Sequence, residues 1–174
     1  MEEIPLKFSC DDITLDVAIL LQRFKIDNPW ITEKWQAIGV IPTKKNTGKT
    51  NEITLISNIN NEPIYRHDGF ILELVHDELD SYYQNLVSAN ASIFIVCREE
   101  EDDRPKPFLV TLSYDEAAIY METDETIYTV AIDIQIYQTI ERFVLENYKP
   151  EKRKKRKLVK GTAGKHYQKM SIYE

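Results

Sequence analysis

Alternating hydrophobic and polar positions run through most of the chain and predict short strands. The runs are rich in Val, Ile, Leu, Thr and aromatic residues, which favour extended backbone. No regular exchange of strands with helices occurs, so the pattern does not favour a doubly wound parallel sheet. The predicted strands cover residues 13–24, 35–41, 52–57, 63–67, 70–76, 91–98, 108–112 and 127–132.

Turn-forming residues separate these strands. Residues 27–30 contain an Asn-Pro pair, which favours turn initiation, and residues 58–62 have the composition of a turn. Asp68-Gly69 predicts a hairpin, because both residues tolerate a positive φ. The polar residues 43–51 predict a loop, and the acidic residues 99–107 predict an exposed connection.

Three segments have the periodicity or the caps of helices. Residues 77–87 place Leu79, Tyr82, Tyr83 and Leu86 at helical spacing. Ser113 followed by Glu116 is a capping box, which begins a short helix that ends near residue 121. Asp133 caps a last helix that Pro150 stops, and its predicted buried side contains Ile136, Ile140, Phe143, Val144 and Asn147.

These elements predict an α+β fold. We expect an antiparallel, strand-dominated body in which the sheet is barrel-like or strongly bent. A short helix and a long C-terminal helix complete it. With 174 residues, 43% of them hydrophobic, the chain can bury a core without a metal or a disulfide. No uncharged apolar run is long enough to span a membrane.

The net charge of −7 hides an uneven distribution. Residues 151–174 hold nine Lys and Arg and two acidic residues, a net of +7. Residues 1–150 then hold 13 basic and 27 acidic residues, a net of −14. We therefore predict one acidic domain over residues 1–150 and a basic, disordered tail over residues 151–174. The tail begins with six consecutive cations: Lys152, Arg153, Lys154, Lys155, Arg156 and Lys157.

Such a tail can serve several purposes. It can contact an acidic protein, an anionic membrane surface or a nucleic acid, fold back on the acidic body, or simply aid solubility. A dedicated nucleic-acid-binding protein normally also has a basic folded face. Because the body is acidic, nucleic acid is the less favoured partner. The N-terminus lacks the features of a secretory signal, so we expect a cytoplasmic protein.

The cysteines and the one phosphate-loop-like segment do not indicate an active site. Cys10 and Cys97 form no C-x-x-C pair, and Cys97 lies in a strand-like run, so we expect a buried reduced thiol. Gly48-Lys49-Thr50 lacks the earlier glycine of a phosphate-binding loop and is better explained as a loop. We predict no cofactor.

His67, His76, Asp77 and Glu78 are the first candidates if the chain is an enzyme. They could hold a metal or form an acid/base pair, but their spacing matches no defined template. The two histidines fall at opposite ends of a predicted strand. Surface positions, with Asp77 as a helix N-cap, are the simpler interpretation.

Aromatic residues supply the candidate partner-binding positions. Trp30 and Trp35 bracket a predicted turn, where they could anchor a partner or plug the end of a barrel. The chain has ten Tyr, which suit half-buried positions or an interaction surface. Tyr82 and Tyr83 are the tyrosines that we expect at such a surface.

Four segments in a fixed order resemble a known family. They are NPW at 28–30 with WQAIGVIP at 35–42, YQNL at 83–86, PFLVTLSYDEA at 107–117, and the helix 140–148 leading into KRKKRK at 152–157. Together they resemble a small bacterial family of unknown function, encoded beside molybdenum-dependent formate dehydrogenase and its accessory genes. The resemblance covers residues 13–157 and implies a partner context; it implies no catalytic residue.

The leading hypothesis is therefore a non-enzymatic accessory or assembly protein of a formate dehydrogenase system. It would bind enzyme subunits or maturation factors through Trp30, Trp35 or its Tyr-rich surface. The basic tail would add a salt-sensitive contact to the partner or to an anionic membrane. A nucleic-acid-associated protein that uses the tail and an enzyme of unrecognised type are the alternatives.

Overall fold

The structure is a computed structural model that describes residues 12–44, 52–100, 104–123 and 125–149. Seven strands, one 3-10 helix and three α-helices alternate irregularly along them. Their order is β1 (Ile13–Lys25), β2 (Glu33–Pro42), β3 (Ile53–Ile59), β4 (Glu62–Leu74), η1 (His76–Glu78), α1 (Leu79–Leu86), β5 (Ser92–Glu99), β6 (Pro105–Thr111), α2 (Tyr114–Met121), β7 (Thr126–Ala131) and α3 (Ile134–Asn147).

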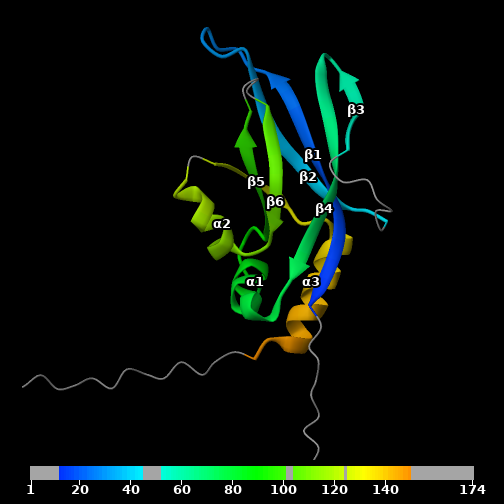
Figure 1. Ribbon diagram of the computed structural model, residues 1–174, viewed down its shortest axis with the longest axis vertical. Helices are drawn as coiled ribbons and strands as arrows, with labels where there is room; N and C mark the ends of the chain where they lie inside the picture. Colours follow the sequence, from blue (N-terminus) through cyan, green and yellow to red (C-terminus); the bar gives the residue numbers. More distant parts are fainter. Residues whose placement is uncertain (1–11, 45–51, 101–103, 124, 150–174) are drawn as a thin grey trace, which may run out of the picture.

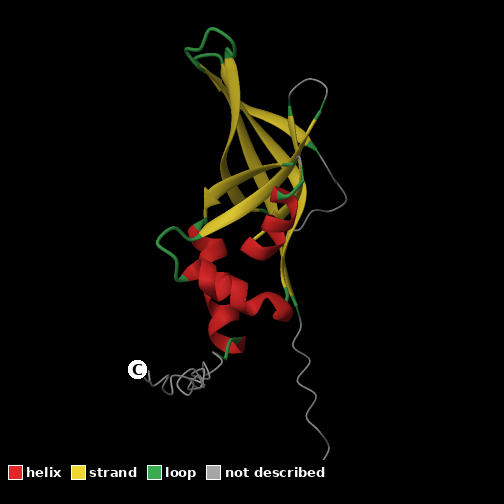
Figure 2. Ribbon diagram, turned by 90° about the vertical axis from the view of Figure 1, so that its left-hand side faces the viewer, coloured by secondary structure: helices red, strands yellow, loops and turns green. Residues whose placement is uncertain are grey.

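The strands form two antiparallel sheets. One has the order β2-β1-β4-β3 and the other the order β6-β5-β7. Both sheets extend away from the helices, which gather at the opposite end of the molecule (Figures 1 and 2). The predicted α+β class with antiparallel pairing is confirmed.

One hydrophobic core joins the two sheets to α1 and α3. Every second residue of the middle of β1 and of β5 belongs to this core, as period-2 strands require. The residues between them on β5, Phe94 and Val96, are buried as well, so both faces of that strand are covered. The predicted buried side of the last helix also contributes. Fully or almost fully buried members of the core are Val17, Ile19, Leu21, Leu72, Leu74, Tyr82, Ile93, Ile95, Cys97, Ile136, Ile140 and Phe143.

The expected barrel-like or strongly bent sheet is wrong. No backbone ladder joins the described strands of the first sheet to those of the second, although β2 lies near β7 and β4 near β6. A physical reason lies in the edge strand β6, where Pro105 and Pro107 have no backbone N–H to donate. The two sheets therefore pack together without closing.

The predicted hairpin at Asp68-Gly69 is also wrong, because β4 continues through both residues. The pairing with β1 steps from Val17–Phe70 to Ile19–His67, so β4 holds one extra residue there. Gly69 has a φ of 93°, which a β-bulge uses as readily as a turn does. The Asp-Gly pair does mark a residue with a positive φ, but that residue lies in a β-bulge within a long strand and not in a hairpin turn.

The actual hairpin lies at residues 60 and 61, inside the predicted turn at 58–62. Asn60 and Asn61 have φ values of 57° and 61°, as a two-residue type I′ turn requires. The turn joins β3 to β4 and pairs Ile59 with Glu62. It fixes β3 at the outer edge of the four-stranded sheet.

The helix caps are partly as predicted. The Ser113 side chain accepts a hydrogen bond from the Glu116 N–H, and the Asp133 side chain accepts one from the Gln135 N–H. Asp77 does not cap α1, whose N-cap is Glu78 without a side-chain capping bond. None of the helices in the described residues is both long and apolar enough to cross a membrane.

Candidate functional site

The loop between β1 and β2 presents Trp30 to solvent in a fixed position. The Asn28 Oδ1 accepts hydrogen bonds from the N–H of Trp30, at 2.8 Å, and of Ile31, at 3.2 Å. The Ile26 N–H donates to the Thr32 carbonyl at 3.0 Å and closes the loop. This Asx turn explains the Asn-Pro signal, and it leaves the Trp30 side chain 90% exposed.

Trp35 lies on β2 and takes a different role. It is half-buried, and its ring centroid lies 5.7 Å from that of Tyr65 on β4. The guanidinium of Arg104, the residue before β6, lies 5.6 Å from the Tyr65 ring centroid. Trp35, Tyr65 and Arg104 thus form a continuous stack from one sheet to the other, with an aromatic–aromatic and a cation–π contact.

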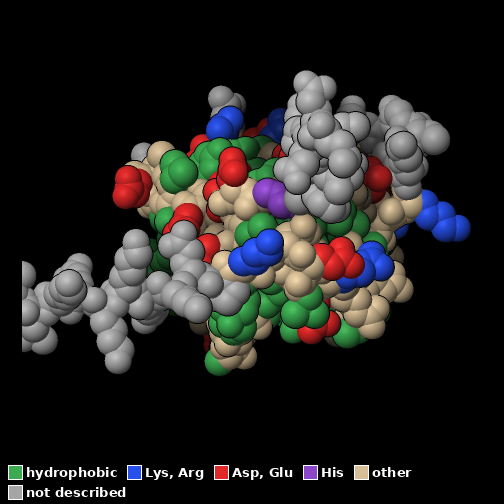
Figure 3. Space-filling model, turned by 90° about the horizontal axis from the view of Figure 1, so that it is seen from below, with side chains coloured by type: hydrophobic (Ala, Val, Ile, Leu, Met, Phe, Trp, Pro, Cys, Tyr) green, Lys and Arg blue, Asp and Glu red, His purple; other side chains and the backbone are tan. Residues whose placement is uncertain are grey.

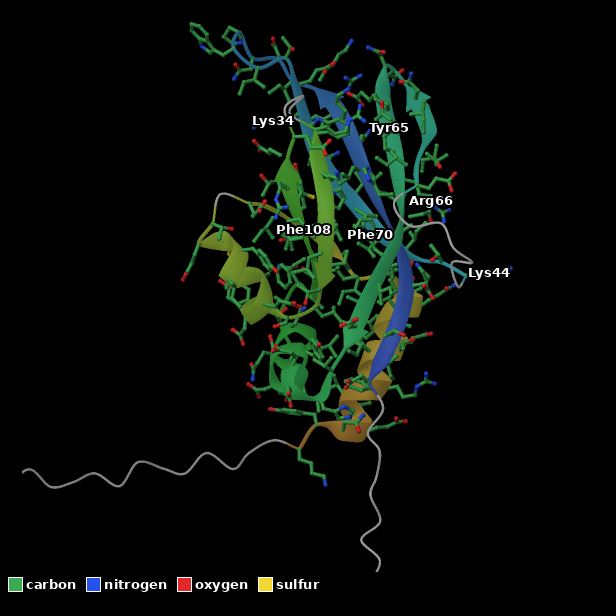
Figure 4. The ribbon with its side chains drawn as sticks, in the orientation of Figure 1. Lys34, Lys44, Tyr65, Arg66, Phe70 and Phe108 are labelled. Carbon is green, nitrogen blue, oxygen red and sulfur yellow. The ribbon has the colours of Figure 1, made fainter. Side chains whose placement is uncertain are left out.

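Trp35 and Arg104 border an open cleft of about 970 Å³ at the end of the sheets that lies away from the helices. Figure 4 shows Lys34 and Tyr65 at this end of the molecule. We call it the tryptophan cleft. Its lining comes from the β1–β2 hairpin and from the facing ends of β5, β6 and β7: Arg23, Trp30, Ile31, Thr32, Glu33, Lys34, Trp35, Glu99, Arg104, Pro105 and Tyr128.

The tryptophan cleft carries three cations and two carboxylates in an otherwise acidic body. An Arg23 guanidinium nitrogen lies 3.3 Å from a Glu33 carboxylate oxygen, while the Arg23 Nε is buried without a hydrogen-bond partner among the described residues. Burial, with smaller effects of Cys97 and Glu99, raises the pKa of Tyr128 to about 12. The phenol is protonated at neutral pH, and Tyr128 adds a hydroxyl to the residues that line the cleft.

The two candidate tyrosines, Tyr82 and Tyr83, lie on α1, at the end of the molecule opposite the tryptophan cleft. Tyr82 is 2% exposed and belongs to the core, so the expectation of a surface position for it is not met. Burial raises its pKa to about 12. Tyr83 is half-buried and stacks on Tyr148 at 4.5 Å between ring centroids, and the Tyr148 hydroxyl donates to Asp80 at 2.7 Å. Tyr82 therefore packs inside the protein, whereas a role of half-buried Tyr83 in partner binding stays a prediction.

The six cations at 152–157 and the Gly48-Lys49-Thr50 segment lie outside the described residues. The helical end, viewed in Figure 3, shows acidic, basic and hydrophobic side chains interspersed among the described residues. No basic patch dominates that visible surface. A folded basic face of the kind that nucleic-acid binding requires is therefore not seen on this side of the described body.

The candidate catalytic residues are not brought together. His67 lies within β4 and His76 beyond its end, so extended backbone separates them by roughly 25 Å. The His76 Nδ1 lies 3.2 Å from an Asp12 carboxylate oxygen. Glu78 accepts a 2.7 Å hydrogen bond from the hydroxyl of Ser113, which is fully buried. Asp77 is exposed.

His67 is the most perturbed of these groups. Burial is the main cause that lowers its pKa to about 4, with a smaller contribution from Arg104. It lines an open groove of about 550 Å³ with Phe70 and Phe108, which Figure 4 places side by side on β4 and β6. Across the described ranges, no group of three or more His, Cys, Asp and Glu side chains could hold a metal ion.

The predicted buried thiol is confirmed for Cys97, which is fully buried on β5 and unpaired. Burial, with a smaller contribution from Glu125, raises its pKa to about 12. Such a thiol is inert, since the thiolate is the reactive form. Cys10 lies outside the described residues.

Sequence reasoning found the two tryptophans but missed Arg23, Tyr65, Arg104 and Tyr128. Arg23, Arg104 and Tyr128 line the cleft and Tyr65 stacks on Trp35 beside it, and only the pairing of strands far apart in the sequence brings them together. The one available signal was Arg104, a lone cation that ends the acidic run before Pro105.

Comparisons with known proteins give one result. A family model described as "Protein of unknown function (DUF3305)" matches residues 16–157, which is more than half of the chain. Apart from the first three residues of β1, the match covers every described strand and α-helix, and it includes the six consecutive cations. The searches of curated proteins and of solved structures gave no match.

Proposed function

The chain belongs to the DUF3305 family, and from that premise we propose that it is a non-enzymatic accessory or assembly protein. It acts in a molybdenum formate dehydrogenase system by binding a subunit or a maturation factor. The choice of this enzyme system rests on the resemblance to a family that is encoded beside such enzymes. The tryptophan cleft supplies the binding surface.

The exposure of Trp30 is the observation that carries this proposal. A side chain that is 90% exposed contributes little to the core, yet its backbone is held in place because the Asn28 Oδ1 accepts hydrogen bonds from the N–H groups of Trp30 and Ile31. Trp is enriched among the residues that dominate protein–protein binding energy. Because these hydrogen bonds already order the loop, partner binding costs less conformational entropy than it would if the loop had to become ordered on binding.

The rest of the tryptophan cleft suits a segment of a partner protein. Half-buried Trp35 offers an aromatic face beside Trp30, and Tyr128 adds a hydroxyl. Arg23, Lys34 and Arg104 can bind carboxylates of the partner. The basic residues 152–157 add a second, salt-sensitive contact to an acidic surface.

An affinity purification from the native cells tests the proposal. Tagged full-length protein should enrich formate dehydrogenase subunits or maturation factors, as identified by mass spectrometry. The Trp30→Ala variant should no longer enrich these proteins. The control Ile119→Ala truncates an exposed hydrophobic residue elsewhere, on α2, and should enrich them as wild-type protein does.

The tail is tested in the same assay. Removal of residues 151–174 should reduce recovery at low salt and make the remaining recovery less sensitive to added salt. Enrichment of RNA and ribosomal proteins in place of the enzyme would favour the nucleic-acid alternative. Equal recovery with wild-type protein and Trp30→Ala would refute docking at the tryptophan cleft.

A further inference from the structure

The outer edge of the four-stranded sheet is uncharged and apolar. Among the described strands, β3 pairs with β4 alone, and its seven residues, ITLISNI, include no charge, no Pro and no Gly. Four of the seven are large aliphatic residues that are between 48% and 71% exposed: Ile53, Leu55, Ile56 and Ile59. An edge with this composition is a template for pairing with another strand.

The other edge strands of the described sheets carry protection that β3 lacks. β2 has Glu33 and Lys34 at its start and ends at Pro42. β6 contains Pro105 and Pro107, and β7 lies beside β2. β3 has a bulge between Leu55 and Ser57, which bends the edge but adds neither charge nor proline. It is therefore the edge that is open to strand addition.

An apolar groove continues this surface on the side of the second sheet. The groove of about 550 Å³ begins at Ile53 and is lined by Phe70, Ile71 and Phe108. Ile71 is 50% exposed and Phe108 is 37% exposed. A strand that is added to the free edge of β3 would pair with its backbone groups and lie beside its four exposed aliphatic side chains.

We propose that β3 pairs antiparallel with β3 of a second copy of this chain, so that the protein forms a symmetric dimer. A neutral strand offers no charge with which to select an acidic or a basic partner, and its best complement is another neutral apolar strand. This chain supplies one. Antiparallel pairing also sets Glu52, which precedes β3, near the Ile59 end of the other copy, so the two carboxylates do not meet.

The pairing joins two four-stranded sheets into one sheet of eight strands across the two-fold axis. It leaves the tryptophan clefts of both copies accessible, because no residue of β3 lines that cleft. The dimer is therefore independent of the proposed partner binding. Either proposal can fail while the other stands.

Sedimentation velocity of the full-length chain from 1 to 200 µM tests the dimer. Wild-type protein should convert to a dimer over this range. Ile56→Lys, which places like charges at the centre of the pairing, should weaken dimerisation at least tenfold. Leu145→Lys is the matched control, since Leu145 is 77% exposed on α3, and it should dimerise as wild type does.

Hydrogen exchange identifies the surface involved. Amides of residues 53–59 should exchange more slowly at 200 µM than at 1 µM in wild-type protein, and this slowing should be clearly smaller in Ile56→Lys. If wild-type protein were monomeric at 200 µM, the proposal would be overturned, and a strand of a different protein would be the remaining candidate to pair with β3. A dimer whose residues 53–59 gain no protection would overturn it as well.

Discussion

Asn85 ties the first helix to the second sheet, and its replacement gives the sharpest test of the fold. The side chain, 8% exposed, lies near the end of α1. Its Nδ2 donates to the Ser92 carbonyl at 2.7 Å and to the Leu112 carbonyl at 2.8 Å, and its Oδ1 accepts from the Ser92 N–H at 3.0 Å. One amide thus joins α1 to the start of β5 and to the residue that follows β6.

Asn85→Ala removes all three hydrogen bonds and leaves buried backbone groups without those partners. At about 1 kcal/mol net for each bond, the free energy of unfolding should fall by about 3 kcal/mol. For a chain of this size, that loss lowers the melting temperature by roughly 6–12 °C. Asn85→Asp keeps the acceptor but loses both donated bonds, so it should cost about 2 kcal/mol or more.

Urea denaturation followed by circular dichroism measures these differences. Gln84→Ala is the control, because Gln84 is the exposed neighbour on the same helix and its truncation should change stability by less than about 0.5 kcal/mol. If Asn85→Ala were no less stable than Gln84→Ala, the three-bond network would not exist as described.

Three further predictions concern buried or strained groups. The folded state keeps His67 neutral down to about pH 4, whereas the unfolded chain protonates near pH 6.5, so stability present above pH 6.5 is lost as the pH falls toward 4. In urea titrations at pH 7 and pH 4.5, His67→Gln should reduce that loss by about 2 kcal/mol, and an unchanged loss would contradict it. In a Cys10→Ser background, Ellman's reagent at pH 8 should leave native Cys97 unmodified and label it in urea; rapid labelling of the native protein would refute its burial. Gly69→Ala should cost about 1–2 kcal/mol because of its φ of 93°, whereas Gly39→Ala, with no atom within 4 Å of the added Cβ, should cost nothing; equal stability of the two variants would argue against the bulge.

Local signals in the sequence located most elements. The strand at residues 13–24, the capping residues Ser113 and Asp133, and the buried side of α3 all agree with the structure, because each depends on neighbours within a few residues. The Asp68-Gly69 pair misled, since a positive φ at glycine serves a bulge and a hairpin equally.

The arrangement of the strands in space could not be predicted from these local signals. The division into two sheets depends on which strands pair, and no local pattern specifies that. Likewise, Trp35 was visible as a candidate, but its stack with Tyr65 and Arg104 joins positions 30 to 69 residues apart in the chain. The prediction of a surface position for Tyr82 failed for a related reason. Helical spacing identifies the face of α1 on which Tyr82 lies, but only the tertiary packing shows that this face is buried.

Binding at the tryptophan cleft is the central claim, and the dissociation constant of the purified partner measures it most directly. Titration calorimetry should compare wild-type protein, Trp30→Ala and the control Ile119→Ala. Loss of an anchoring Trp costs about 2 kcal/mol or more, so Trp30→Ala should bind at least about 30-fold more weakly. Ile119→Ala should bind within twofold of wild type. A Trp30→Ala variant that binds a formate dehydrogenase subunit or maturation factor as tightly as wild-type protein would contradict the account.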